Sequence, residues 1–101
     1  MYEQFISRYP KLGEAWDCIT EAGEAGPLDD RTCRLIKLAI AIGAMRTGAV
    51  HSSVRKALGM GISRQELEQV VALAAGTLGL PSTVAAFGWV QELLDDSAPT
   101  S

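Results

Sequence analysis

The sequence predicts an all-α fold, a small bundle of five or six helices in a single domain covering residues 1–101. Apolar side chains recur every three or four residues in successive segments, which is the spacing of one face of a helix. Glycine and proline separate these segments, and none of them shows the alternation that is typical of a strand. A chain of 101 residues has room for one hydrophobic core, so we expect no second domain.

Breakers and capping residues mark the ends of the first helices. Pro10 stops the first helix, and the glycines and proline at 23–27 stop the second. Asp29 or Asp30 can cap the third, which places an acidic group near the positive end of its dipole. The expected helices cover residues 2–8, 11–22, 31–45, 49–58, 64–78 and 82–95, and a polar tail follows at 96–101.

The later helices carry boundary signals of the same kind. Residues 46–48 interrupt the apolar pattern after the third helix, and glycines close the fourth. Ser63 and Glu66 have the spacing of a capping box at the start of the fifth helix. Pro81 suits the first turn of the sixth, where the missing N–H has no helical partner to lose.

Apolar surface is too abundant for one small bundle. Hydrophobic residues make up 48% of the chain, and the helices at 31–45 and 64–78 are apolar around most of their circumference. One bundle buries one broad stripe of each helix, so the surplus predicts a homo-oligomer. We expect Phe87 or Trp89 in or beside the contact.

Charge and cysteine usage exclude several classes of protein. The net charge is −3 and the nine basic residues are scattered, so no nucleic-acid partner is expected. The longest apolar run, residues 38–45, is far short of the ~20 residues that span a membrane, and the N-terminus lacks the apolar core of a signal peptide. Cys18 and Cys33 form neither a CxxC pair nor a zinc-ligand pattern. We therefore expect a cytoplasmic protein with free thiols, no metal and no cofactor.

The order of segments at 35–74 has a counterpart in a known family. An apolar helix is followed by a break, a helix that ends with Ala57 and Gly61, and a helix start at Ser63–Arg64–Gln65–Glu66. This order resembles the carboxymuconolactone decarboxylase and alkylhydroperoxidase D family over about residues 28–94. The resemblance implies the alkylhydroperoxidase D fold, assembled as a homotrimer or homohexamer.

The peroxidatic members of that family use a glutamate, a CxxC pair and a histidine. Counting back from Ala57 places Arg34 at the glutamate, Arg46 and Ala49 at the cysteines, and Ser53 at the histidine. Thiol–disulfide chemistry needs an attacking thiolate and a second thiol, and this chain has neither at its position. We therefore expect no dithiol-dependent reduction of hydroperoxides.

Four residues near the changed positions are candidates for a site. His51 is the candidate general acid or base, because histidine exchanges protons near neutral pH. Arg34 and Arg46 are suited to binding a carboxylate, with Ser53 as a pocket hydroxyl. Two residues along a helix are about 200° apart, so His51 reaches the pocket of Ser53 only if its helix begins late, near residue 50.

Structural roles remain open for the same residues. In the alternative, His51 is a polar residue near a helix N-terminus, and Arg34 pairs with Asp30 one turn earlier. Arg46 then interacts favourably with the negative end of a helix dipole. Cys33 is either a thiol activated near a helix N-terminus or a small buried apolar residue.

The resemblance implies a carboxymuconolactone decarboxylase-like protein of small-molecule metabolism with an anionic ligand. As an enzyme it would be a lyase or proton-transfer catalyst without a cofactor, acting on a small carboxylated compound. His51 would move the proton and an arginine would hold the carboxylate. Two alternatives stay open: a non-catalytic binding or scaffold homologue that lost the site, and a peroxiredoxin-like thiol antioxidant that uses Cys33.

Overall fold

The computed structural model describes residues 1–97, and within that range every regular element is an α-helix, which confirms the predicted fold class. None of the described helices is long and apolar enough to cross a membrane. Of the expected tail at 96–101, residues 96 and 97 belong to the last helix and 98–101 lie outside the described residues. The helices are α1 (Tyr2–Arg8), α2 (Pro10–Glu24), α3 (Asp30–Gly43), α4 (Thr47–Gly59), α5 (Arg64–Leu78) and α6 (Leu80–Ser97).

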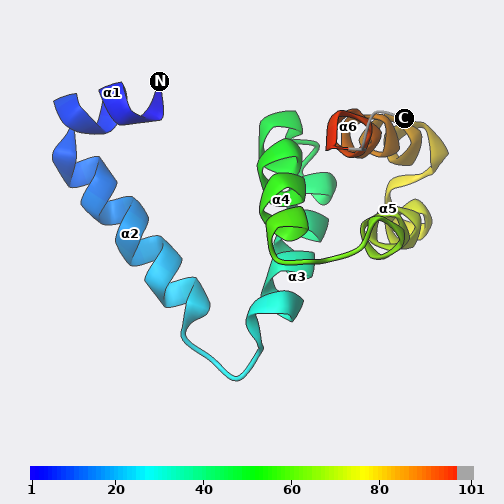
Figure 1. Cartoon of the computed structure of the whole chain (residues 1–101), viewed down its shortest axis with the longest axis horizontal. Helices are drawn as coiled ribbons and strands as arrows, with labels where there is room; N and C mark the ends of the chain where they lie inside the picture. The colour runs from blue at the N-terminus through cyan, green and yellow to red at the C-terminus, as the bar shows by residue number, and fades with distance from the viewer. Residues whose placement is uncertain (98–101) are drawn as a thin grey trace.

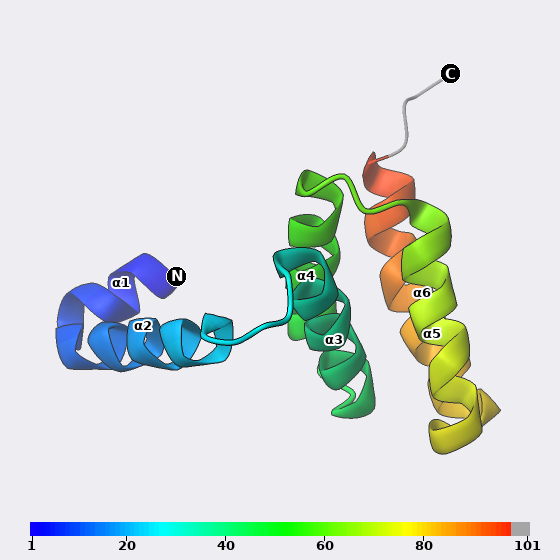
Figure 2. The same cartoon turned by 90° about the horizontal axis from the view of Figure 1, so that it is seen from below.

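The helices form two parts, an arm made of α1 and α2 and a bundle made of α3–α6 (Figures 1 and 2). In the arm, α1 packs on α2 where Ile6 lies against Gly13, and a Cβ atom at Gly13 would come within 2.6 Å of the Ile6 side chain. In the bundle, α3 packs against α4 and α5, and α6 packs against the same two helices. Residues 25–29 connect the two parts, and α2 diverges from the bundle with distance from this connection. The radius of gyration is therefore 15.0 Å, above the ~13 Å of a compact chain of about 100 residues.

The hydrophobic core lies inside the bundle. Each bundle helix contributes residues spaced three or four apart, because that spacing brings side chains to one face. The buried core residues are Leu38, Ala41, Ile42, Val50, Val54, Ala57, Ile62, Leu67, Val71, Ala86, Val90 and Leu94.

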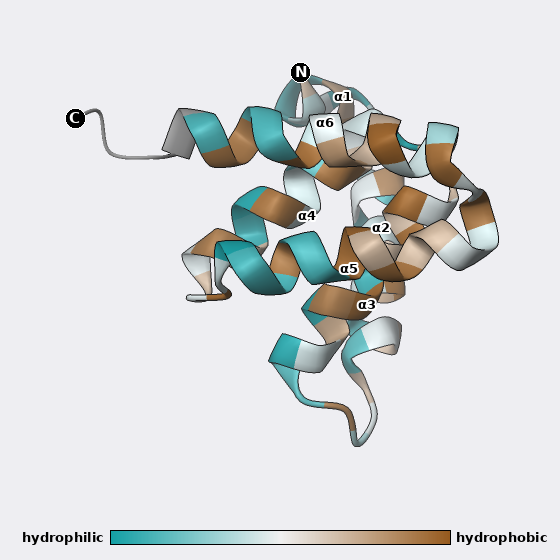
Figure 3. Cartoon of the chain, turned by 90° about the vertical axis from the view of Figure 1, so that its right-hand side faces the viewer, coloured by the Kyte–Doolittle hydropathy of each residue, from teal (hydrophilic) through white to brown (hydrophobic). Residues whose placement is uncertain are grey.

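A single copy buries one side of α3, as expected for a helix of a bundle with one interior. Leu38, Ala41 and Ile42 are buried, whereas Ile36 is 42% exposed and Ile40 is 64% exposed. One bundle has one interior, so it covers one stripe of α3. Figure 3 also shows apolar residues, coloured brown, on the turns of the bundle helices that face the viewer.

Capping side chains set the starts of α3 and α5. Asp29, rather than Asp30, caps α3: its carboxylate accepts a hydrogen bond of 2.7 Å from the N–H of Thr32. Hydrogen bonding from the side chain of Thr32, and then from this N–H, holds the pKa of Asp29 below its ordinary value. Ser63 caps α5 by accepting from the backbone N–H of Glu66 at 3.2 Å. The carboxylate of Glu66 bonds to Arg31 of α3, so the capping residue and the inter-helix ion pair share this end of α5.

The break between α3 and α4 lies earlier than the sequence indicates. The helix ends at Gly43, Met45 takes a left-handed backbone conformation with φ 54°, and α4 begins at Thr47. Gly48, expected in the break, is helical. The left-handed residue turns the chain sharply enough that α4 starts without an irregular first turn.

Replacing Met45 by glycine is expected to raise the free energy of unfolding by about 1 kcal/mol. The left-handed conformation costs a residue with a Cβ atom about 1–2 kcal/mol, and glycine avoids this cost. Urea denaturation measures the change. Ala44→Gly is the matched control, because Ala44 has an ordinary φ of −82°, and it should lower stability. Loss of stability in Met45→Gly would contradict the expectation.

Candidate functional site

A cavity of about 620 Å³ lies between the arm and the bundle, where α2 faces α3 and α4. The arm supplies Trp16, Ile19, Thr20 and Gly23 to its wall. The opposite wall comes from α3, from the turn after it and from α4. It contains Arg34, Lys37, Ile40, Ala41, Ala44, Arg46, Ala49, Ser52, Ser53 and Lys56. We call this space the cationic cavity.

Positive charge dominates the polar part of this cavity. Arg34, Lys37, Arg46 and Lys56 line it, and no aspartate, glutamate or histidine of the described chain does so. None of the four forms an ion pair with a described carboxylate. Cations that share a partly enclosed space without counter-charge create a positive potential that attracts anions.

Arg34 is the most constrained of these cations. It is half-buried, and its Nε atom is buried without a hydrogen-bond partner among the described residues. The alternative pairing of Arg34 with Asp30 is not formed in the described chain. A buried donor without an acceptor is costly, so a hydrogen-bond acceptor is missing at this atom among the described residues.

Arg46 and Ser53 reach the cavity from the start and the middle of α4. Arg46 occupies the N-cap position of α4 with an extended backbone. Ser53 is 6% exposed and follows the core residue Val50 by three positions, so its hydroxyl lies at the edge of the core face. Both residues contribute polar groups to the wall that α3, α4 and the turn between them form.

His51 lies away from the cationic cavity. Its Nε2 atom is 3.0 Å from a carboxylate oxygen of Glu92 on α6, and its side chain is 24% exposed. Because α4 is regular from Thr47 onward, His51 and Ser53 are about 200° apart around the helix. The structure therefore brings Arg34, Arg46 and Ser53 together and separates His51 from them.

The sequence did not single out the two lysines or the tryptophan. Lys37 lies one turn after Arg34, and Lys56 lies one turn after Ser53, so helical spacing alone was a usable signal for both. Trp16 comes from the arm, and no local pattern indicates that α2 faces α4.

The two cysteines lie in different surroundings, and both thiols are free. Cys18 is exposed on α2. Cys33 is half-buried, with its Sγ atom 3.7 Å from the carbonyl oxygen of Leu28. It lines a separate hollow of about 300 Å³, together with Arg34 and Lys37. The absence of dithiol peroxidase activity stays a prediction.

Comparison with protein families gives one finding. Residues 10–92 match the carboxymuconolactone decarboxylase family. The matched range includes all of α2–α5 and most of α6, and so every residue of the cationic cavity. Neither curated proteins nor solved structures gave a match.

Proposed function

Because this chain belongs to the carboxymuconolactone decarboxylase family, we propose that it serves small-molecule metabolism by binding a small carboxylated compound in the cationic cavity. The supporting observation is the set of four cations, with no acid of the described chain, around one cavity. A guanidinium binds a carboxylate with two parallel hydrogen bonds, which suits Arg34 and Arg46. Ser53 adds a hydroxyl, and Trp16 offers an apolar surface to the body of the ligand.

The chemistry that we propose is proton transfer or decarboxylation without a cofactor. In decarboxylation the bond to the carboxylate carbon breaks, CO₂ leaves, and the electron pair stays on the remaining carbon until a proton arrives. In proton abstraction, negative charge develops on the substrate in the same way. Cations fixed around that charge lower the barrier, because they are oriented before the reaction starts.

The proton carrier that we propose, His51, lies outside the cationic cavity. His51 stays a prediction for that role, since its imidazole bonds to Glu92 and not to a group in the cavity. A carboxylate that orients a histidine is an arrangement used by general bases. His51 would meet the substrate only if the ligand or a second copy extends to the other side of α4.

The second candidate is a binding homologue without catalysis. The specific observation in its favour is that no histidine or carboxylate of the described chain lines the cationic cavity. Such a protein would bind the same class of anion and release it unchanged. The thiol-antioxidant alternative has weaker support, because Cys33 is half-buried and lies outside the cationic cavity.

Benzoate and benzamide are suitable probes of the anion site, because they share one shape and differ in charge. In calorimetric titrations, benzoate is expected to bind more tightly than benzamide. Arg34→Gln and Arg46→Gln should each weaken benzoate binding about tenfold to a hundredfold, since a hydrogen bond to a charged group contributes about 1.5–3 kcal/mol.

Arg64→Gln is the matched control for these variants. Arg64 bonds to Gln91 and Asp95 outside the cavity, so its loss should leave benzoate binding unchanged. His51→Gln should also leave binding unchanged, and it should lower kcat for any carboxylate that the wild type converts. Equal binding of the two probes, or full binding by Arg34→Gln, would refute the proposed anion site.

A further inference from the structure

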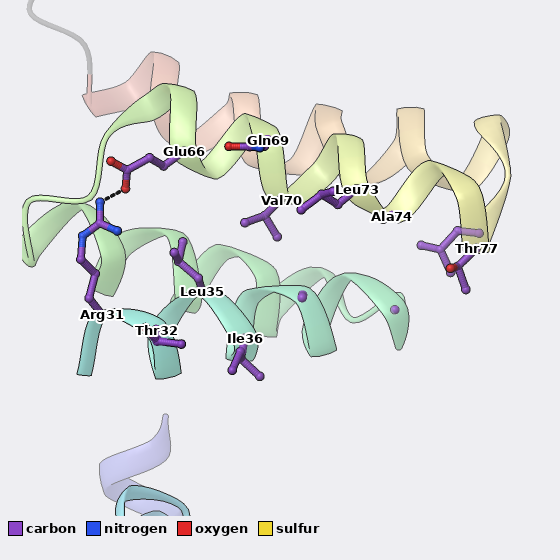
Figure 4. A pocket seen from close by; sticks show the side chains of 13 residues that line it. Arg31, Thr32, Leu35, Ile36, Glu66, Gln69, Val70, Leu73, Ala74 and Thr77 are labelled. Carbon is purple, nitrogen blue, oxygen red and sulfur yellow. Dashed lines mark hydrogen bonds and ion pairs between the residues drawn. The ribbon is translucent and has the colours of Figure 1, made fainter. Parts of the chain in front are cut away.

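A groove lies between α3 and α5, on a different face of α3 from the cationic cavity (Figure 4). Its volume of about 640 Å³ is within the range of about 300–1,000 Å³ that is typical of small-molecule sites. Leu35, Val70, Ala74 and Leu78 of its wall are packed against the hydrophobic core. Because the core fixes these residues, the wall is in place without a ligand.

The groove is long and apolar over most of its length. On α3 its lining runs from Arg31 to Gly43, which is about 18 Å along the helix. Ile36 and Leu73 are 42% and 73% exposed, so the groove leaves apolar side chains in contact with water. A ligand with an apolar body that covers them is therefore favoured by the hydrophobic effect. The apolar lining consists of Leu35, Ile36, Ala39, Gly43, Val70, Leu73, Ala74 and Leu78.

Polar side chains gather at one end of the groove. Arg31 and Thr32 come from the first turn of α3, and Glu66 and Gln69 come from the start of α5. Figure 4 shows the ion pair of Arg31 and Glu66 across this end, whereas Thr77 lies at the opposite end. A ligand that matches the groove is therefore an amphiphile, with its polar head at the ion pair.

The charges at the polar end indicate which head group fits. Arg31 and Glu66 neutralise one another, and Thr32 and Gln69 are uncharged. A carboxylate head would have to compete with Glu66 for Arg31, and an ammonium head would have to compete with Arg31 for Glu66. A hydroxyl or amide head can accept from the guanidinium and donate to the carboxylate, which leaves the ion pair intact. Charge complementarity therefore favours an uncharged head group.

We propose that the α3–α5 groove binds an uncharged, elongated amphiphile. Its apolar tail lies between α3 and α5, and its hydroxyl or amide head bonds to the Arg31–Glu66 pair. This class of ligand differs from the small carboxylate proposed for the cationic cavity, and the two sites share no residue. Either proposal can therefore fail without the other.

Three probes with one tail and different heads test the proposal on the full-length chain. Decanol, decanoate and decylammonium are titrated by calorimetry at concentrations below those at which they form micelles. Decanol should bind at one molecule per chain, about twofold to fivefold more tightly than either charged probe, since an exposed ion pair contributes up to about 1 kcal/mol. From hexanol to decanol the affinity should rise about fourfold with each methylene, because each one becomes buried.

Methyl signals in NMR spectra locate the bound probe. Decanol should shift the signals of Leu35 and Val70, which line the groove. The signals of Val54 should not move, because this side chain is fully buried in the core and does not line the groove. Shifts confined to Ile19 and Ile40, which line the cationic cavity, would place decanol in the wrong site.

A matched pair of tryptophan variants tests the tail. Ala39→Trp fills the groove and should weaken decanol binding at least about tenfold, since each methylene kept out of the groove costs about fourfold. Ala72→Trp is the control, because Ala72 is exposed on α5 and does not line the groove. It should bind decanol like the wild type. Circular dichroism and light scattering check that both variants keep the fold and mass of the wild type.

Two charge variants test the head. Glu66→Gln leaves Arg31 without its carboxylate, so decanoate should gain about twofold to fivefold over decanol. Arg31→Gln leaves Glu66 without its cation, so decylammonium should gain by a similar factor. The backbone N–H of Glu66 is capped by Ser63, so the start of α5 should remain intact in both variants.

Several results would overturn the proposal. They are no binding of decanol to the wild type, undiminished binding to Ala39→Trp, or a head-group preference that neither charge variant changes. Binding of decanol only after dilution has dissociated an oligomer would also overturn it, because a second copy of the chain would then be the occupant of the groove.

Discussion

Light scattering of the wild-type protein at micromolar concentration is expected to give three or six times the 10.8 kDa mass of one chain. The described part of the chain leaves large apolar side chains in solvent on the arm, on α3, on α5 and on α6. Those more than 60% exposed beyond residue 1 are Ile19, Ile40, Leu73, Leu80 and Val84. Burying apolar surface contributes about 25 cal/mol per Å², so contacts of standard size outweigh the entropy lost on association.

A heterologous contact between copies would account for the expected number of copies. A heterologous contact that closes on itself forms a ring, and two rings can pair back to back into a hexamer. Phe87 is 41% exposed on the outer side of α6, and Trp89 is half-buried against the core, so Phe87 is the more available for a second contact. A mass near 10.8 kDa at all concentrations would contradict the expected assembly.

Leu38→Ala is expected to lower the free energy of unfolding by about 3–5 kcal/mol. Leu38 has no exposed surface and lies on α3, the helix that contacts both α4 and α5. Removing its side chain loses apolar burial and leaves a cavity that rigid neighbouring helices cannot close. A small domain has only about 5–15 kcal/mol of stability in total, so the variant should approach unfolding.

Leu80→Ala is the matched control for this core substitution. Leu80 is 70% exposed at the start of α6, so the same chemical change there should cost less than about 1 kcal/mol. Chemical denaturation of both variants in one buffer compares the two sites directly. Equal losses in the free energy of unfolding for Leu38→Ala and Leu80→Ala would contradict the placement of Leu38 in the core.

Local signals were sufficient to predict the helices. Helix-period spacing, the cap at Ser63 and the proline at Pro81 depend only on near neighbours in the chain, so the predicted bounds differ from the observed ones by three residues or fewer. The break at Met45 was misplaced, because no sequence signal marks a non-glycine residue for the left-handed region. What covers the exposed side of α3 cannot be predicted from local spacing, because spacing within one helix does not indicate which other segment or chain packs against it.

The site was predictable only in part, for a similar reason. Spacing from the family pattern selected Arg34, Arg46 and Ser53, and these residues share a cavity. His51 was linked to them through a late start of α4, and α4 in fact begins at Thr47. Trp16 could not be selected, since its position depends on how the arm lies relative to the bundle.

Residues 25–29 join the arm to the bundle. A cut there divides the chain but does not divide an oligomer that contacts between copies hold together. All five residues are exposed and non-helical, which is the kind of backbone that proteases cleave first. A cut there leaves α1–α2 and α3–α6 as two pieces with their helices intact. If the expected oligomer holds each arm against a neighbouring copy, the nicked protein keeps its mass in buffer and releases fragments only in denaturant. The covalent connection would then set which arm belongs to which bundle, while non-covalent contacts between copies hold the particle together.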